Sequence, residues 1–217
     1  MNYHKTPIKV LLPVAYLPAA EYFAYLAAAD EVVIELHETY PRQSWRNRCS
    51  IMTANGALDL IVPVKKPEGK HSKTADVLIS NHENWQKKHW RSIVSAYNKA
   101  PYFFYYSDLL APFFENQQPE KLWEYNHVVM HAIMDELNID AKTAYTEFYN
   151  RTSDDALDLR GVLTPKTHRR PAHTHIEWPD YQQVFSDRHG FKANLSIADL
   201  LFNLGPDTEQ YLKSIRL

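Results

Sequence analysis

The chain of 217 residues has one cysteine, five glycines and no long apolar run. A single cysteine excludes an intrachain disulfide framework and suits a reducing compartment. No segment approaches the roughly 20 apolar residues that a membrane-spanning helix needs, so we expect no membrane span. With so few glycines, neither a dinucleotide-binding fingerprint nor a P-loop is present.

The chain also lacks a large excess of charge of either sign, because it has 24 basic and 26 acidic side chains and a formal net charge of -2. Binding to a nucleic-acid backbone needs a broad basic surface, so we expect no nucleic-acid partner. An anionic ligand would need a local basic cluster, and residues 42–48 and 65–73 are the two candidates. The first 14 residues favour a strand over a signal peptide, and we expect a cytoplasmic protein.

The chain is rich in apolar residues, which make up 45% of it, and can bury a substantial core. Residues 8–13 and 31–36 favour strands, and residues 18–29 between them favour a helix, which predicts a βαβ unit with parallel strands. Residues 47–53 and 58–64 flank Asn55-Gly56, which predicts a hairpin. With a further strand at residues 75–79, residues 1–80 are expected to form a mixed sheet.

Helical patterns follow the predicted sheet. Residues 81–99 and 119–137 each place apolar side chains on one face, and residues 194–206 combine a Ser or Asn cap with a Gly-Pro stop. We therefore predict a single α/β domain over residues 1–217. It would have a sheet-rich part (1–80), a helical part (81–140) and a loop-rich tail with a docking helix (141–217).

The polar residues 41–51 give the strongest functional signal. Guanidinium groups bind phosphate and carboxylate oxygens, and an indole offers a flat face to a sugar or base. These properties predict a site for a small anionic or sugar ligand, whose binding residues are Tyr16, Trp45, Arg46, Asn47, Arg48 and Asn126. Alternatively, the charged residues are a solvated strand end that repels other sheet edges.

Two residues are candidates for catalysis. Cys49 follows Arg48, which would lower the pKa of the thiol and favour a nucleophile, although a lone cysteine in a strand is more often a small buried hydrophobe. His89 lies on the apolar face of the helix at 81–99 and could act as a general base, or be a hydrogen-bonded core residue. Asn126 also lies in an apolar stripe and needs a ligand or a backbone partner.

The sequence contains two further clusters of possible functional residues. His168, His173 and His175 suggest a metal site, but no further ligand completes a zinc signature, so no metal site is predicted. The aromatic residues 97–106 suit core packing or the border of a sugar pocket. The sequence identifies no cofactor and no oligomeric state.

Several blocks together resemble the WbqC-like family of bacterial proteins. They are Tyr16-Leu17-Pro18, Glu21-Tyr22-Phe23, Gln43-Ser44-Trp45-Arg46-Asn47-Arg48, Val62-Pro63-Val64, Trp85 with His89, Ile93 and Tyr97, Ala100-Pro101-Tyr102-Phe103, and Asn194-Leu195-Ser196-Ile197 with Asp199-Leu200-Leu201-Phe202-Asn203 and Gly205-Pro206. The collinear set covers most of the chain. The resemblance implies a role in surface-polysaccharide (O-antigen) biosynthesis, in which relatives are associated with glycyl or other small-acyl transfer to an amino sugar.

The chain departs from the family pattern in two places. Pro13-Val14-Ala15-Tyr16 stands where members often have Gln-Pro-x-Tyr, and residues 36–40 lack the usual paired acids, for which His37 and Glu38 could substitute. The hypothesis is a transferase in which Arg46 and Arg48 bind the donor, Asn47 orients it and His89 deprotonates an attacking amine, at the meeting of residues 41–51, residues 65–73 and the His89 helix. The alternative is a non-catalytic protein that binds a nucleotide sugar or a partner enzyme.

Overall fold

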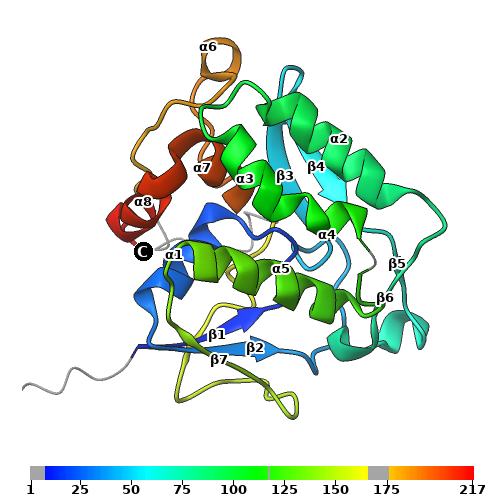
Figure 1. Cartoon of the computed structure of the whole chain (residues 1–217). Helices are drawn as coiled ribbons and strands as arrows, with labels where there is room; N and C mark the ends of the chain where they lie inside the picture. Colours follow the sequence, from blue (N-terminus) through cyan, green and yellow to red (C-terminus); the bar gives the residue numbers. More distant parts are fainter. Residues whose placement is uncertain (1–7, 117, 166–175) are drawn as a thin grey trace, which may run out of the picture.

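The computed structural model describes residues 8–116, 118–165 and 176–217. Its main sheet contains four parallel strands in the order β7-β2-β1-β8, namely β1 (Lys9–Pro13), β2 (Glu31–Glu35), β7 (Lys142–Tyr145) and β8 (Leu157–Asp158). Helix α1 (Ala20–Ala28) connects β1 to β2, which confirms the predicted βαβ unit (Figure 1). The α/β class is therefore confirmed.

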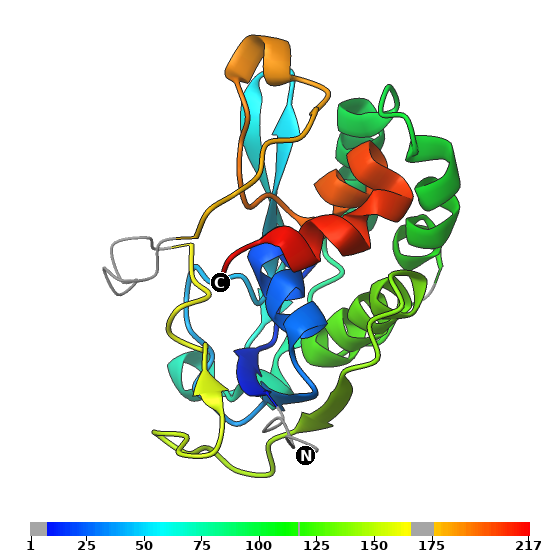
Figure 2. The same ribbon diagram turned by 90° about the vertical axis from the view of Figure 1, so that its left-hand side faces the viewer.

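The predicted hairpin is also present, as β3 (Arg48–Thr53) paired antiparallel with β4 (Gly56–Ile61). It does not join the main sheet: it forms its own two-stranded sheet, as do β5 (Val64–Lys65) and β6 (Leu78–Ile79). The expectation of one mixed sheet within residues 1–80 is wrong, because β7 and β8 occupy the positions beside β2 and β1. Figure 2 shows the hairpin standing away from the main sheet, with α6 (Ser186–His189) at its tip.

The other three predicted helices are confirmed as α2 (Trp85–Tyr97), α5 (Leu122–Glu136) and α7 (Ile197–Leu204). Ser196 caps α7 by accepting a hydrogen bond from the Ala198 amide, and Gly205 ends it with a φ of 56°. The sequence did not predict α3 (Phe103–Leu110), α4 (Pro112–Glu115), α6 or α8 (Thr208–Ser214). Short 3-10 turns occur at Gly69–His71, Thr74–Asp76 and Gly205–Asp207.

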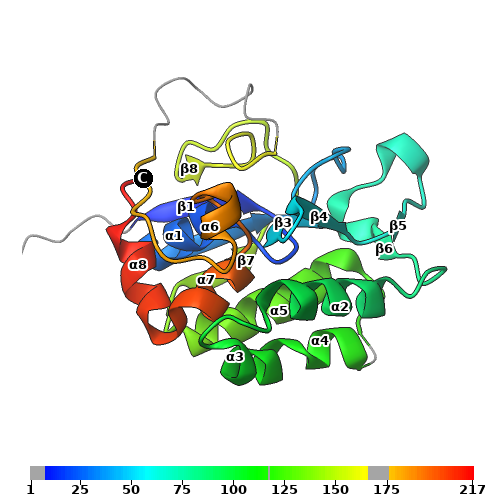
Figure 3. The same cartoon turned by 90° about the horizontal axis from the view of Figure 1, so that it is seen from above.

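The two faces of the main sheet differ. Val10, Leu12, Val32 and Ile34 are buried on the face that the helices cover, whereas Leu11 and Val33 point to the opposite face. Figure 3 shows α5 and α3 on one side of the strands and the segment leading into β8 on the other. The core therefore lies between the sheet and the helices.

The aromatic residues 97–106 divide between interior and surface. Tyr97, Phe103 and Tyr106 are buried, and the first two pack on Phe202 of α7. Phe104 and Tyr105 are exposed. The buried rings of the cluster thus pack the end of α2 and the start of α3 against α7.

Candidate functional site at the carboxyl ends of the strands

Arg46 lies in the interior and is already paired. Its Nε and one terminal nitrogen donate to the two carboxylate oxygens of Glu38, at 2.6 and 2.9 Å, and the side chain is almost completely buried. A two-pronged pair of this kind uses the part of the guanidinium that would grip an anion. The predicted role of Arg46 in donor binding has no support from this geometry.

Asn47 and Arg48 are held by the hairpin. The Asn47 side-chain amide donates to the Val62 carbonyl at 2.8 Å, and Arg48 reaches Asp59 on β4 at 3.4 Å. Arg48 therefore points across the hairpin while Arg46 points to the loop after β2. The two guanidinium groups do not converge on one ligand.

His89 is buried on the inner face of α2, where its Nδ1 lies 2.9 Å from the Tyr16 hydroxyl. Burial lowers the pKa of His89 from 6.5 to about 4, opposed by a hydrogen bond to the Ile61 backbone. The imidazole is therefore neutral at physiological pH, and both Tyr16 and Ile61 hold it in place. This is the hydrogen-bonded core histidine of the alternative interpretation, and its role as a base stays a prediction.

Cys49 is also an interior residue, with 3% of its surface exposed. Burial raises the pKa of its thiol well above the ordinary value, opposed by a hydrogen bond to Ser196. The expected lowering by Arg48 is wrong because desolvation of the thiolate dominates. A thiol in this state is a poor nucleophile, so the geometry does not support covalent catalysis by Cys49.

Two small cavities lie on either side of Ala15 and Tyr22, at the carboxyl end of β1. We call them the Trp45 cavity, lined also by Pro13, Ala19, Glu21, Leu163 and Asn194, and the Asn126 cavity, lined also by Val14, Ile34, Trp123, His127, Met130 and Tyr145. Together they form the β1 crevice. In the main sheet, β2 and β7 lie on one side of β1 and β8 lies on the other, so the direction in which the chain adds strands reverses at β1. Open parallel sheets bind their ligands at such a reversal, at the carboxyl ends of the strands.

Glu21 and Asn194 supply the polar wall of the Trp45 cavity. The Asn194 amide group donates to a carboxylate oxygen of Glu21 at 2.9 Å, and its carbonyl oxygen accepts from the Glu21 backbone N–H at 2.9 Å. Asn194 adopts a left-handed backbone with a φ of 58°, a conformation that asparagine tolerates better than most residues. The carboxyl group of Glu21, which is 1% exposed, is thereby fixed at the cavity.

Two polar atoms of the Asn126 cavity have no hydrogen-bond partner within the described ranges, namely Asn126 Oδ1 and Trp123 Nε1. The other side of the Asn126 amide donates to the Arg46 carbonyl at 2.8 Å, which fixes its orientation. An unpaired buried polar group costs about 1–3 kcal/mol, so an unpaired acceptor and an unpaired donor beside one cavity suit a ligand that offers both.

His127 and Tyr145 close the outer side of the Asn126 cavity, with a hydrogen bond between the His127 ring and the Tyr145 hydroxyl. Burial, and next the neighbouring His131, lower the pKa of His127, while burial raises the pKa of Tyr145 to about 12. Both groups are therefore neutral near pH 7. The cavity wall on this side carries no formal charge.

Buried charges also gather at the ends of β2 and β8. Arg160 donates to Glu35 at 2.7 Å and forms a two-pronged pair with Asp158, and Glu35 also accepts from the backbone N–H of His37 and Glu38. The sequence analysis missed Glu21, Glu35, Arg160 and Asn194 as candidates. An acid near the end of a predicted parallel strand, as Glu35 is in the strand predicted at residues 31–36, was the available signal.

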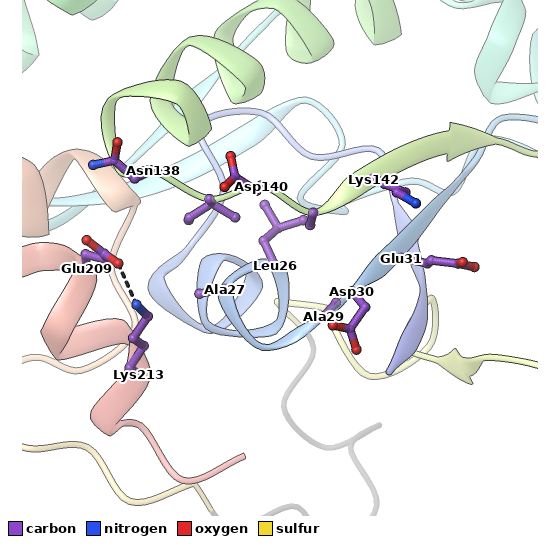
Figure 4. A pocket seen from close by; sticks show the side chains of 12 residues that line it. Leu26, Ala27, Ala29, Asp30, Glu31, Asn138, Asp140, Lys142, Glu209 and Lys213 are labelled. Atoms are coloured by element: carbon purple, nitrogen blue, oxygen red, sulfur yellow. Dashed lines mark hydrogen bonds and ion pairs between the residues drawn. The ribbon is translucent and has the colours of Figure 1, made fainter. Parts of the chain in front are cut away.

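The largest of five cavities within the described residues lies at the opposite edge, beside the first residues of β2 and β7. Its volume is about 490 Å³, and it is lined by the ends of α1 and α5 and by α8 (Figure 4). Its charged groups are at the surface, and Glu209 and Lys213 pair with each other. Of five cavities within the described residues, none is lined by Arg46, Arg48, Cys49, His89 or residues 65–73, so these cavities do not support the predicted location of the site, which stays a prediction.

Across residues 8–116, 118–165 and 176–217, no group of three or more histidine, cysteine or acidic side chains is arranged to hold a metal ion. His168, His173 and His175 lie outside these ranges. The helices of the described chain are all too short or too polar to cross a bilayer.

The fold and crevice define an α/β protein whose polar interior lies at the carboxyl ends of a short parallel sheet. The sequence pattern of the WbqC-like protein family matches residues 14–167, and the chain belongs to this family. A relative from Mycobacterium tuberculosis (strain ATCC 25618 / H37Rv), the uncharacterized protein Rv1507c, is 30% identical over 224 residues, which cover 93% of this chain and 95% of the relative. No solved structure matches the chain significantly.

Proposed function

We propose that the protein transfers a glycyl or other small acyl group to an amino sugar in bacterial surface-polysaccharide (O-antigen) biosynthesis, and that the β1 crevice is its site. Membership of the WbqC-like family supports the polysaccharide context. The observation that carries the location is the meeting of Glu21, Trp45 and the unpaired polar atoms of Asn126 and Trp123 around Ala15 and Tyr22.

The size of the crevice restricts what enters it. The free volume of each cavity is about 10 Å³, which is room for about one water-sized group. An amine or a carbonyl fits, whereas a sugar ring does not. The ring would lie against the half-buried indole of Trp45, with only its reacting group inside.

The proposed reaction needs one proton acceptor. The amine nitrogen attacks the acyl carbon of an activated donor such as a thioester, the new C–N bond forms, and the bond to sulfur breaks with its electron pair. Glu21 accepts the amine proton, which then passes to the departing thiolate. Trp123 Nε1 and Asn126 Oδ1 line the other cavity, where they bind a hydroxyl or amide group of the substrate and not the reacting atoms.

The alternative is a non-catalytic protein that binds a nucleotide sugar or a partner enzyme of the same pathway. The positions of His89 and Cys49 favour it, because both are buried and neither lines any of the five cavities found within residues 8–116, 118–165 and 176–217. Turnover distinguishes the two functions, since a binding protein holds the sugar without forming an amide.

The test incubates the protein with UDP-linked amino sugars and a set of small acyl thioesters, and follows amide formation by mass spectrometry. We expect Glu21→Gln to lower kcat by about 10²–10⁴-fold, the usual contribution of a general base. Glu31→Gln, at the amino edge of the sheet, is the matched control and should keep full activity. Equal activity of both variants would overturn the role of Glu21, and saturable sugar binding without any product would favour the alternative.

A further inference from the structure

A fourth cavity occupies the face of the main sheet that the helices leave uncovered. Its volume is about 360 Å³, within the range of about 300–1,000 Å³ that ligand sites usually have. Its floor is formed by Lys9, Leu11, Val33 and Glu35, and its walls come from the segment between β7 and β8. We call it the Phe148 cavity, and it is separate from the β1 crevice.

The wall segment is held in one shape by Arg160. This guanidinium donates to the Asn150 carbonyl at 2.8 Å and lies 5.3 Å from the centre of the Tyr149 ring. Its hydrogen bonds to Asp158 and Glu35 raise its pKa, so it stays charged. A preformed wall lowers the entropy that a ligand loses on binding.

The charges of the Phe148 cavity are largely paired among themselves. Lys9 pairs with Asp155 at 2.6 Å, and Glu35 pairs with Arg160. The side chains of Asn150, Thr152 and Asp154 make no hydrogen bond or ion pair within the described part of the chain. These groups offer an amide, a hydroxyl and a carboxylate, which bind hydroxyl and amino groups and repel an anion.

Phe148 lines the cavity and is 63% exposed. Exposing an aromatic ring to water is unfavourable, but a ring at the wall of a cavity offers a flat apolar face to a ligand. A flat apolar face beside an amide, a hydroxyl and a carboxylate matches the two sides of a sugar ring.

We propose that the Phe148 cavity binds one uncharged or amine-bearing monosaccharide unit, with the sugar ring on Phe148 and its hydroxyl or amino groups on Asn150, Thr152 and Asp154. The site goes beyond the proposed transfer reaction and does not depend on it. It would hold a sugar unit at a distance from the β1 crevice.

The experiment titrates the full chain with N-acetylglucosamine, glucosamine and glucuronate and follows binding by saturation-transfer NMR. We expect the first two to bind saturably and glucuronate not to compete. Phe148→Ala should weaken binding by about tenfold or more. Phe104→Ala is the matched control, because Phe104 is 81% exposed but lies on α3 and does not line the cavity.

Two further variants test a polar contact of the Phe148 cavity and distinguish this cavity from the β1 crevice. Thr152→Ala removes an exposed hydroxyl, leaves the fold unchanged, and should weaken binding about threefold. Trp45→Ala alters only the β1 crevice and should leave this binding unchanged, whatever happens to acyl transfer. The proposal is wrong if no saturable binding occurs, if Phe148→Ala and Phe104→Ala bind equally, or if Trp45→Ala abolishes binding.

Discussion

The two edges of the main sheet differ in the burial of their charged groups and in the size of their cavities. At the carboxyl edge, Glu21, Glu35 and Arg46 are buried, Glu38 is half-buried, and the cavities of the β1 crevice are small. At the amino edge, the cavity is about 490 Å³ and its charged side chains face water. Cavity size therefore does not identify the candidate site of this protein, whereas the burial of polar groups does.

The loss of hydration on burial explains why buried polar groups are the better indicator of a site. A buried charge loses its hydration and is retained only with good partners, while an exposed pair gains and loses little. The carboxyl edge thus holds groups that folding alone does not favour. The amino edge holds groups that any soluble protein surface tolerates.

The largest expected effect compares ion pairs at the two edges. Glu38→Ala leaves Arg46 buried without its carboxylate, and we expect a loss of about 3–5 kcal/mol in the free energy of unfolding. Glu209→Ala, which removes the exposed pair with Lys213, should cost about 0.3–0.5 kcal/mol. Urea unfolding measures both, and similar losses would erase the contrast between the edges.

A pH series examines His89, whose pKa is about 4 in the fold and 6.5 when unfolded. Between these values the unfolded chain binds more protons, so stability is complete above pH 6.5 and falls as the pH is lowered toward 4. This histidine should account for roughly 3 kcal/mol of that fall. We expect His89→Phe to show a smaller difference between unfolding at pH 7 and at pH 4.5 than the parent chain, and an unchanged difference would contradict it.

Asn126 in α5 and Asn138 just after it allow a matched comparison with a smaller expected effect on stability. Asn126→Leu leaves the Arg46 carbonyl without its donor and should cost about 1–3 kcal/mol. Asn138 has a φ of 51° at the exposed end of the helix, and Asn138→Gly should change stability by no more than about 0.5 kcal/mol. Thermal unfolding of the two variants side by side gives the answer.

The smallest effect is expected at the largest cavity. The double variant Asp140→Asn with Lys142→Gln changes its lining, and amide formation and sugar binding should stay within about twofold of the parent chain. The same mass-spectrometric and NMR assays measure this. A clear loss would show that the amino edge participates in function.

The sequence predicted what depends on neighbouring residues. Asn55-Gly56 specified the hairpin, and Ser196 with Gly205 specified both ends of α7. Strands β7 and β8 were missed because each is short and finds its partner far away in the sequence. Their pairing depends on tertiary structure and not on a local pattern.

The site was harder to predict for a related reason. The density of arginines at residues 42–48 indicated ligand binding, but the guanidinium of Arg46 turns inward to Glu38, eight residues earlier. Only the fold decides whether a charged group meets a ligand or another side chain. Trp45 and Asn126 were predicted and do line cavities, whereas Glu21 and Asn194 come together from opposite ends of the chain.

The contact between Glu21 and Asn194 has a consequence for how such sequences vary. Position 194 needs a residue that accepts a left-handed backbone and also carries an amide that donates to the carboxyl group of Glu21 and accepts from its backbone N–H. Aspartate would meet the backbone requirement but oppose one carboxylate with another, and glycine would meet it but supply no amide. Relatives that lose the acid at position 21 should therefore lose the asparagine at 194 too, a paired change that an alignment of the family can reveal.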